Sequence, residues 1–184
     1  MFLKQGKRGK AYSLLEGFSK AQYSYVALLD ADMQYPPEAI PEMMKQLERG
    51  GVDIVVANRV ERETTLLRRF LSRSFNFVFA QFLHDLHVDV QAGLKVFRRK
   101  ILREVVLDPT PWTFDLEFLL SARNYGYVIG GVPIVFAERQ AGESKIKFLE
   151  AMYEIGWNAL RLRFKGRPPL LLTPETTASM IGAG

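Results

Sequence analysis

The stretch Leu28-Leu29-Asp30-Ala31-Asp32-Met33-Gln34-Tyr35-Pro36-Pro37-Glu38 decides the fold, because an apolar run ends in it at two carboxylates and an amide. Residues 25–29 are aromatic, β-branched or apolar, which is typical of a buried strand of a parallel sheet. Asp30, Asp32 and Gln34 lie two residues apart, so in an extended chain their side chains point to the same side. Such oxygen ligands suit Mg²⁺ or Mn²⁺, which bind one or two carboxylates together with substrate phosphates. We therefore predict a divalent-metal site here and a diphosphate substrate; the alternative is a solvated turn.

The composition indicates one globular domain. The chain has 184 residues, and its hydrophobic content of 48% is enough for a sizeable core. It contains no cysteine, which excludes disulfides, zinc thiolate sites and thiol nucleophiles. Any metal must therefore bind oxygen or histidine. The two histidines, His84 and His87, have no third ligand beside them in the sequence, so we interpret them as structural residues.

The charge of the chain predicts an anionic partner. Its formal net charge is +5, which favours phospholipid, nucleic acid or a phosphorylated substrate. No segment reaches the roughly 18 to 20 apolar residues that a membrane-spanning helix requires. The basic residues 1–10 are not followed by the apolar core of a signal peptide. We expect a cytoplasmic protein that is peripheral to the inner face of the membrane.

Helical and strand patterns alternate along the chain, which indicates an α/β fold. We predict strands at 25–29, 52–57, 93–97 and 132–136, the last one after a break at Gly130 and Gly131. We predict helices at 11–21, 37–49 and 113–125. Residues 66–83 and 146–164 combine cations with apolar and aromatic residues at helical spacing, which suits an anionic membrane surface. For residues 146–164 an ordinary core-packing helix is the alternative.

Three segments together resemble the family 2 glycosyltransferases, in particular the dolichyl-phosphate mannosyltransferase-like branch. They are the metal-site run, residues 89–97 and residues 139–145, and a glycine- and lysine-rich segment at 6–11 precedes them as in that family. The resemblance covers roughly residues 6–145. It implies a GT-A-like (Rossmann-like) mixed sheet flanked by helices. We expect a partial catalytic domain at 1–145, an amphipathic membrane-surface helix at 146–167 and a mobile tail at 168–184.

The resemblance also implies a reaction and a set of site residues. The reaction moves a hexose, mannose or glucose, from a nucleotide-sugar donor to a polyprenyl (dolichyl-type) phosphate, with Mg²⁺ or Mn²⁺ bound by Asp30, Asp32 and Gln34. The metal would neutralise the charge that develops on the departing nucleoside diphosphate. The implied catalytic residues are Asp32, Asp89 and Glu117. The implied substrate-binding residues are Lys10, Arg59, Arg69, Ser72, Arg73, Arg139, Ser144 and Lys145.

This chain also departs from the family pattern. The family begins with a strand, a nucleotide-contacting loop and a second acidic strand end, and the sequence has none of them. We therefore expect a sheet that lacks its first strands and has an unpaired edge, which a partner chain would complete. The alternative function is a noncatalytic module that binds the membrane surface or polyprenyl phosphate. Nucleic-acid binding would need only the basic charge, and we do not expect it.

Overall fold

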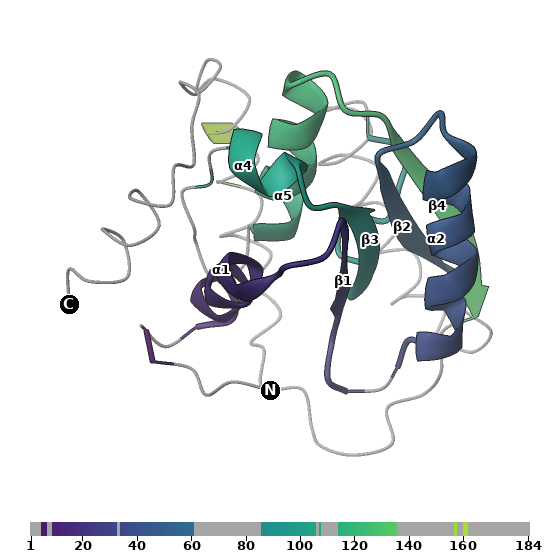
Figure 1. Cartoon of the computed structure of the whole chain (residues 1–184), viewed down its shortest axis with the longest axis horizontal. Helices are drawn as coiled ribbons and strands as arrows, with labels where there is room; N and C mark the ends of the chain where they lie inside the picture. Colours follow the sequence, from purple (N-terminus) through teal and green to yellow (C-terminus); the bar gives the residue numbers. More distant parts are fainter. Residues whose placement is uncertain are drawn as a thin grey trace.

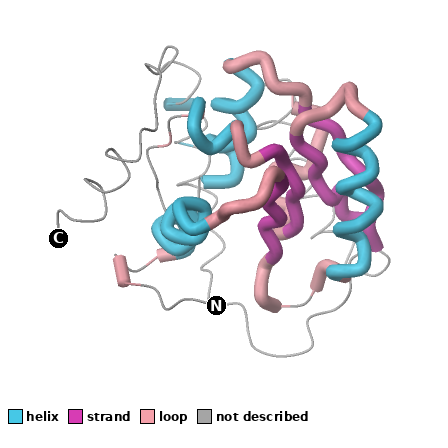
Figure 2. Tube along the Cα trace, in the orientation of Figure 1, coloured by secondary structure: helices cyan, strands magenta, loops and turns pink. Residues whose placement is uncertain are grey.

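The computed structural model describes residues 5–6, 9–32, 34–60, 86–105, 107, 114–135, 157 and 160–161. These residues form a four-stranded sheet with helices on both sides, as Figures 1 and 2 show. The elements follow one another as α1 (Lys10–Lys20), β1 (Tyr25–Leu29), η1 (Pro37–Ala39), α2 (Ile40–Arg49), β2 (Ile54–Val60), β3 (Leu94–Arg98), α4 (Ile101–Glu104), α5 (Phe114–Asn124) and β4 (Ile129–Val135).

The sheet is mixed, which confirms the predicted sheet type. Its strand order is β1-β3-β2-β4. Strand β3 is antiparallel to both β1 and β2, whereas β2 and β4 are parallel. The interpretation of residues 25–29 as a buried strand of a parallel sheet is therefore wrong in its pairing and its burial. Strand β1 lies at the edge of the described sheet, and only Leu28 in it is buried. An edge strand lacks a neighbour on one side, so its side chains are less covered.

A second difference from the prediction concerns two glycines in strand β4. Strand β4 begins at Ile129, so Gly130 and Gly131 lie inside the strand instead of breaking it. A Cβ on Gly131 would lie 2.3 Å from Asn58 Nδ2, and one on Gly130 would lie 2.9 Å from Val52 Cγ1. Gly131 thus permits close packing against β2, and Gly130 permits close packing against Val52, which precedes β2.

The two faces of β3 pack against different helices. Lys95 and Phe97 point toward α1 and α5, where the Phe97 ring lies 5.7 Å from Phe18 and 4.8 Å from Phe118 between centroids. On the other face, Arg98 donates a hydrogen bond to the carbonyl oxygen of Leu47 on α2. Alternate residues of a strand point to opposite faces, so β3 connects both helical layers.

Several predicted elements lie outside the described residues. Residues 66–83 and the tail at 168–184 are among them, as is most of the helix predicted at 146–164. Within that last segment, Trp157, Leu160 and Arg161 are helical, and Trp157 is 65% exposed. None of the helices in the described ranges combines the length and the apolar composition that crossing a membrane requires.

Candidate functional site

The candidate site lies where β1 ends. Asp30 follows the strand directly, and its backbone N–H donates to the carbonyl oxygen of Gly93 at 2.8 Å. Residues 31–32 form a turn, so the alternation that places three side chains on one side in an extended chain ends with the strand. Within this turn the carboxylate of Asp32 accepts a hydrogen bond from the backbone N–H of Gln34 at 3.4 Å. The turn thus brings the side chain of Asp32 back to the backbone of the third predicted ligand.

Gly93 makes close approach to Asp30 possible. A Cβ on Gly93 would lie 2.4 Å from Asp30 Oδ2 and 2.7 Å from Asp30 Cγ. Any side chain at residue 93 would therefore overlap with the carboxyl group. The start of β3 and the end of β1 can hold this position only because residue 93 is glycine.

Lys10 reaches the same carboxylate from the first residue of α1. Gly9 precedes it with φ of 136°, a conformation that a residue with a Cβ rarely adopts, and Ser13 Oγ donates to the Gly9 carbonyl oxygen at 2.9 Å. This turn places Lys10 Nζ 3.0 Å from Asp30 Oδ1. The glycine-rich opening predicted to accompany the metal strand is therefore in contact with it.

A chain of alternating charges continues from Lys10 into the core. Lys10 Nζ lies 3.7 Å from Asp115 Oδ2, and Asp115 Oδ1 lies 2.7 Å from Lys95 Nζ. Lys95 is fully buried and also donates to the carbonyl oxygen of Ala92. Burial lowers the pKa of Lys10, but the carboxylates of Asp115 and Asp30 outweigh it and raise that pKa above its ordinary 10.5. Lys10 is therefore a firmly protonated cation beside Asp30.

A second ion pair joins two of the predicted residues. Arg59, at the end of β2, donates two hydrogen bonds to the carboxylate of Asp89, at 2.5 Å from Nε and 3.1 Å from Nη2. The Asp89 backbone N–H donates to Asn58 Oδ1 at 2.8 Å. Two parallel contacts fix the orientation of a guanidinium more firmly than a single one. The predicted catalytic residue Asp89 and the predicted substrate-binding residue Arg59 thus form one unit.

Tyr35 lies near both groups. It is buried, and burial raises the pKa of its phenol. The Arg59 cation lowers that pKa, while the carboxylates of Asp89 and Asp30 raise it further. Sequence reasoning missed Tyr35 as part of the site, although it directly follows the predicted ligand Gln34.

The remaining predicted residues divide into two sets. Glu117 is described and buried, 7% exposed, near the start of α5. In that segment the carboxylate that contacts Lys10 and Lys95 belongs to Asp115. The other predicted substrate-binding residues lie outside the described residues: Arg69, Ser72, Arg73, Arg139, Ser144 and Lys145.

The donor groups at the end of β1 fit a hard divalent cation only when another ligand joins them. No group of three His, Cys, Asp or Glu side chains suited to a metal occurs among the described residues. Asp30 and Asp32 supply two carboxylates, and the side chain of Asp30 is 35% exposed. Mg²⁺ sites of this kind use one or two carboxylates and complete the coordination with water and substrate phosphates.

A comparison with protein families identifies the chain. The family model of Glycosyl transferase family 2 matches residues 1–106, which contain the end of β1, Gly93 and the Arg59–Asp89 pair. This chain belongs to Glycosyl transferase family 2. The family that the sequence motifs resemble is thereby confirmed.

Curated relatives cover most of this family 2 chain. Undecaprenyl-phosphate 4-deoxy-4-formamido-L-arabinose transferase of Pectobacterium atrosepticum is 27% identical over 175 residues, which are 95% of this chain and 50% of that protein. Polyprenol monophosphomannose synthase of Mycolicibacterium smegmatis is 28% identical over 172 residues, covering 85% of this chain and 64% of that protein. The chain therefore spans between half and two thirds of the length of these two relatives.

Solved structures share the fold. Glucosyl-3-phosphoglycerate synthase from Mycobacterium tuberculosis, in complex with Mn²⁺, UDP-glucose and glycerol 3-phosphate, matches with a TM-score of 0.64 at 16% identity over 90% of this chain and 58% of that one. Mannosyl-3-phosphoglycerate synthase from Rubrobacter xylanophilus matches with a TM-score of 0.61 at 21% identity over 93% and 56%. The GT-A-like fold predicted from the sequence is confirmed.

Proposed function

We propose that this family 2 chain transfers a hexose, mannose or glucose, from a nucleotide-sugar donor to a polyprenyl phosphate at the cytoplasmic face of the membrane, in a metal-dependent reaction. Two relatives named for undecaprenyl-phosphate and polyprenol substrates support this acceptor class. The observation that carries the proposal is the end of β1, where Asp30 and Asp32 lie in the family-matched region beside the Lys10 cation.

In this proposal Asp30, Asp32 and Gln34 hold Mg²⁺ or Mn²⁺ together with diphosphate oxygens of the donor. A bound metal ion supplies Lewis-acid neutralisation of the charge on the leaving nucleoside diphosphate. Gly93 leaves the space in which the Asp30 carboxylate sits. Asp115 and buried Lys95 hold Lys10 in place, so its ammonium group supplies a second positive charge next to the proposed diphosphate site.

The Arg59–Asp89 unit has a separate task. Asp89 orients the guanidinium through two parallel contacts, and we assign the oriented Arg59 cation to the acceptor phosphate because guanidinium groups suit phosphate oxygens. A phosphate acceptor is already an oxyanion at neutral pH, so the reaction does not require a strong general base. Glu117 serves as a further catalytic carboxylate in this proposal, and residues 66–83 and 146–164 dock on the anionic membrane.

Phosphate contacts from outside the described residues complete the proposed site. Arg69, Ser72 and Arg73 join Arg59 at the acceptor phosphate, and Arg139, Ser144 and Lys145 close over the donor phosphates. Cations with a neighbouring hydroxyl suit phosphate oxygens through charge and hydrogen bonding. A partner chain that adds strands at the β1 edge is proposed to complete the recognition of the nucleotide.

The test is a transfer assay with the full chain, Mn²⁺, GDP-mannose or UDP-glucose, and polyprenyl phosphate in vesicles. Asp32→Asn should lower the transfer rate at least a hundredfold, because it removes one of two proposed anionic ligands. Glu48→Gln, which removes an exposed carboxylate on α2, should leave the rate unchanged. Transfer that persists in Asp32→Asn would reject the proposed metal site. Vesicle binding without any affinity for nucleotide sugars would instead favour the noncatalytic module.

A further inference from the structure

A basic pocket lies at the opposite end of the sheet from the candidate site. In the β1–β3 ladder, Leu29 pairs with Leu94 at the metal-site end and Tyr25 pairs with Arg98 at the other end. The four residue steps from Tyr25 to Leu29 separate the two ends by about 13 Å. The pocket has a volume of about 520 Å³ and is lined by Ser24, Tyr25, Asp53 and four cationic side chains, those of residues 98–100 and 103.

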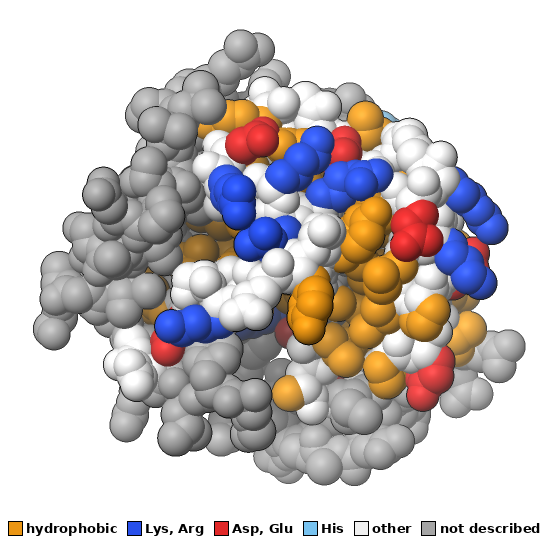
Figure 3. Space-filling model, viewed as in Figure 1, with side chains coloured by type: hydrophobic (Ala, Val, Ile, Leu, Met, Phe, Trp, Pro, Cys, Tyr) orange, Lys and Arg blue, Asp and Glu red, His pale blue; other side chains and the backbone are white. Residues whose placement is uncertain are grey.

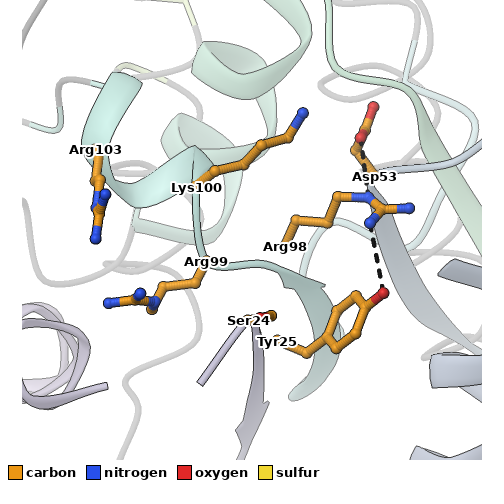
Figure 4. A pocket seen from close by; sticks show the side chains of 7 residues that line it. All are labelled: Ser24, Tyr25, Asp53, Arg98, Arg99, Lys100 and Arg103. Atoms are coloured by element: carbon orange, nitrogen blue, oxygen red, sulfur yellow. Dashed lines mark hydrogen bonds and ion pairs between the residues drawn. The ribbon is translucent and has the colours of Figure 1, made fainter. Parts of the chain in front are cut away.

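One of the four cations is already neutralised. Arg98 Nε lies 3.3 Å from Asp53 Oδ1, and Arg98 Nη2 donates to the Leu47 carbonyl oxygen at 2.6 Å. Its guanidinium also lies 5.7 Å from the centroid of the Tyr25 ring. Figure 4 shows the Arg98–Asp53 ion pair and the hydrogen bond from Arg98 to the Tyr25 hydroxyl on one side of the pocket. Arg98 and Asp53 thus form a rigid, charge-balanced wall.

The other three cationic side chains of the pocket are not balanced by described carboxylates. Arg99 Nη1 donates to the Ala21 carbonyl oxygen at 3.2 Å, and Lys100 Nζ lies 5.1 Å from the centroid of the Tyr127 ring. Arg103 is exposed. Among the described carboxylates, none forms an ion pair with Arg99, Lys100 or Arg103. The nearby Glu104 instead accepts a hydrogen bond from the hydroxyl of Tyr127.

The two arginines among these three side chains are placed to act together. Arg99 lies in the turn that precedes α4, and Arg103 lies four residues further along the chain, within α4. In Figure 4 both side chains extend toward the same side of the pocket, whereas Lys100 extends away from them. On the face shown in Figure 3, Lys and Arg side chains gather in the area where Figure 1 draws α4 and the end of β3.

We propose that this pocket binds a phosphate-bearing ligand, a phosphomonoester or a diphosphate, through Arg99 and Arg103. A guanidinium group can donate two parallel hydrogen bonds to the oxygens of one phosphate. The hydrogen bond to the Ala21 carbonyl oxygen already orients Arg99. Ser24 and Lys100 also line the pocket, although the Lys100 side chain extends away from the two arginines. The volume falls in the range of pockets that hold small ligands. This site is separate from the proposed transfer site and requires no metal ion.

The first experiment measures binding of inorganic pyrophosphate to the full chain by calorimetry, with a chelator present to remove divalent metals. Arg103→Gln should weaken binding about tenfold, because it removes one charge-assisted contact. The Arg103 side chain is exposed and forms no hydrogen bond or ion pair with the described residues, so its loss should leave the thermal midpoint unchanged. Lys45→Gln removes the same charge from the exposed face of α2 and should leave the pyrophosphate affinity within twofold of the wild type.

The second experiment distinguishes a soluble ligand from a lipid headgroup. The wild type and Arg103→Gln are compared on phosphatidylcholine vesicles that contain phosphatidic acid or, at equal surface charge, phosphatidylglycerol. A preference for phosphatidic acid that Arg103→Gln removes assigns the pocket to a lipid phosphate. Pyrophosphate binding without such a preference assigns it to a soluble phosphate. The proposal is overturned if the wild type binds neither probe, or if Lys45→Gln weakens binding as much as Arg103→Gln.

Discussion

Replacing Gly93 with alanine is expected to weaken divalent-metal binding without removing any proposed ligand. The new methyl group would lie 2.4 Å from Asp30 Oδ2 and 3.0 Å from Asp30 Cβ. Ordinary contact begins at 3.4 Å, so the carboxylate oxygen must move by about 1 Å, the difference between 3.4 and 2.4 Å. Rotation of the carboxyl group alone cannot relieve the overlap, because Asp30 Cβ is also too close. The backbone of residue 30 must shift as well, and its N–H donates a hydrogen bond to the Gly93 carbonyl oxygen at 2.8 Å.

The magnitude follows from how closely a binding site must keep its geometry. Site residues have to stay within about 0.5 Å of their productive positions, and the expected shift is about twice that. Changes in residues that support a metal ligand typically cost 10- to 100-fold in affinity. That range corresponds to about 1.4 to 2.7 kcal/mol of binding free energy. Overpacking is also expected to lower the free energy of unfolding by about 1 to 3 kcal/mol.

The assay is Mn²⁺ titration of each variant by calorimetry or electron paramagnetic resonance, at a temperature where all variants are folded. Gly17→Ala adds a methyl group on α1 with nothing within 4 Å of it, so Mn²⁺ affinity should not change. In Gly131→Ala the new methyl group would lie 2.3 Å from Asn58 Nδ2. This variant therefore introduces a similar steric overlap without crowding Asp30. Wild-type Mn²⁺ affinity in a folded Gly93→Ala variant would show that Asp30 does not bind the metal from this position.

Two further predictions concern stability. Asp115→Asn leaves the fully buried Lys95 without its carboxylate partner. The free energy of unfolding, measured in urea, should therefore fall by about 3 to 5 kcal/mol. A loss below about 1 kcal/mol would contradict this account of the pair. Burial and the hydrogen bond to Glu104 raise the pKa of Tyr127 above its ordinary 10.0, so folding favours the neutral phenol. The resulting stabilisation is complete below pH 10.0 and is lost as the pH rises through the higher folded-state value. Tyr127→Phe should therefore flatten the alkaline part of a stability curve, and an unchanged curve would rule this out.

Local patterns were enough to predict most elements but not their pairing. The apolar run at 25–29 predicts a strand, and α5 (Phe114–Asn124) falls almost where helical spacing places it. A short apolar run does not reveal the direction of its neighbour, so the antiparallel β1–β3 pair escaped prediction. Gly130 and Gly131 suggest a break, because their tertiary reason, the close approach of Val52 and Asn58, is invisible in the local sequence.

The same limit applies to the candidate site, where local patterns predicted residues but not the contacts between distant ones. The spacing of Asp30 and Asp32 is a local signal, and it led directly to the end of β1. The Arg59–Asp89 pair joins side chains 30 residues apart, which no local pattern connects. One signal was available and unused: Lys95 interrupts an apolar strand, and a lysine at such a position needs a buried partner. That partner is Asp115.

The charges at the candidate site predict that metal and diphosphate bind cooperatively. Asp30, Asp32 and Asp115 carry three negative charges, and Lys10 and Lys95 carry two positive ones, which leaves one net negative charge. A divalent cation alone would reverse this to a net positive charge directly beside Lys10, 3.0 Å from the shared carboxylate of Asp30. A nucleoside diphosphate removes that excess and adds oxygen ligands.

Mn²⁺ affinity should therefore rise at least fivefold when GDP or UDP is present. Nucleotide affinity should rise by the same factor when Mn²⁺ is present, because coupling between two sites is reciprocal. Lys10→Met should strengthen Mn²⁺ binding in the absence of nucleotide and reduce the coupling, because it removes the cation that competes for Asp30. Lys20→Met, a matched change at the other end of α1, should do neither. Weaker Mn²⁺ binding in Lys10→Met would refute the competition, since it would mean that Lys10 supports the metal ligands instead of opposing the metal.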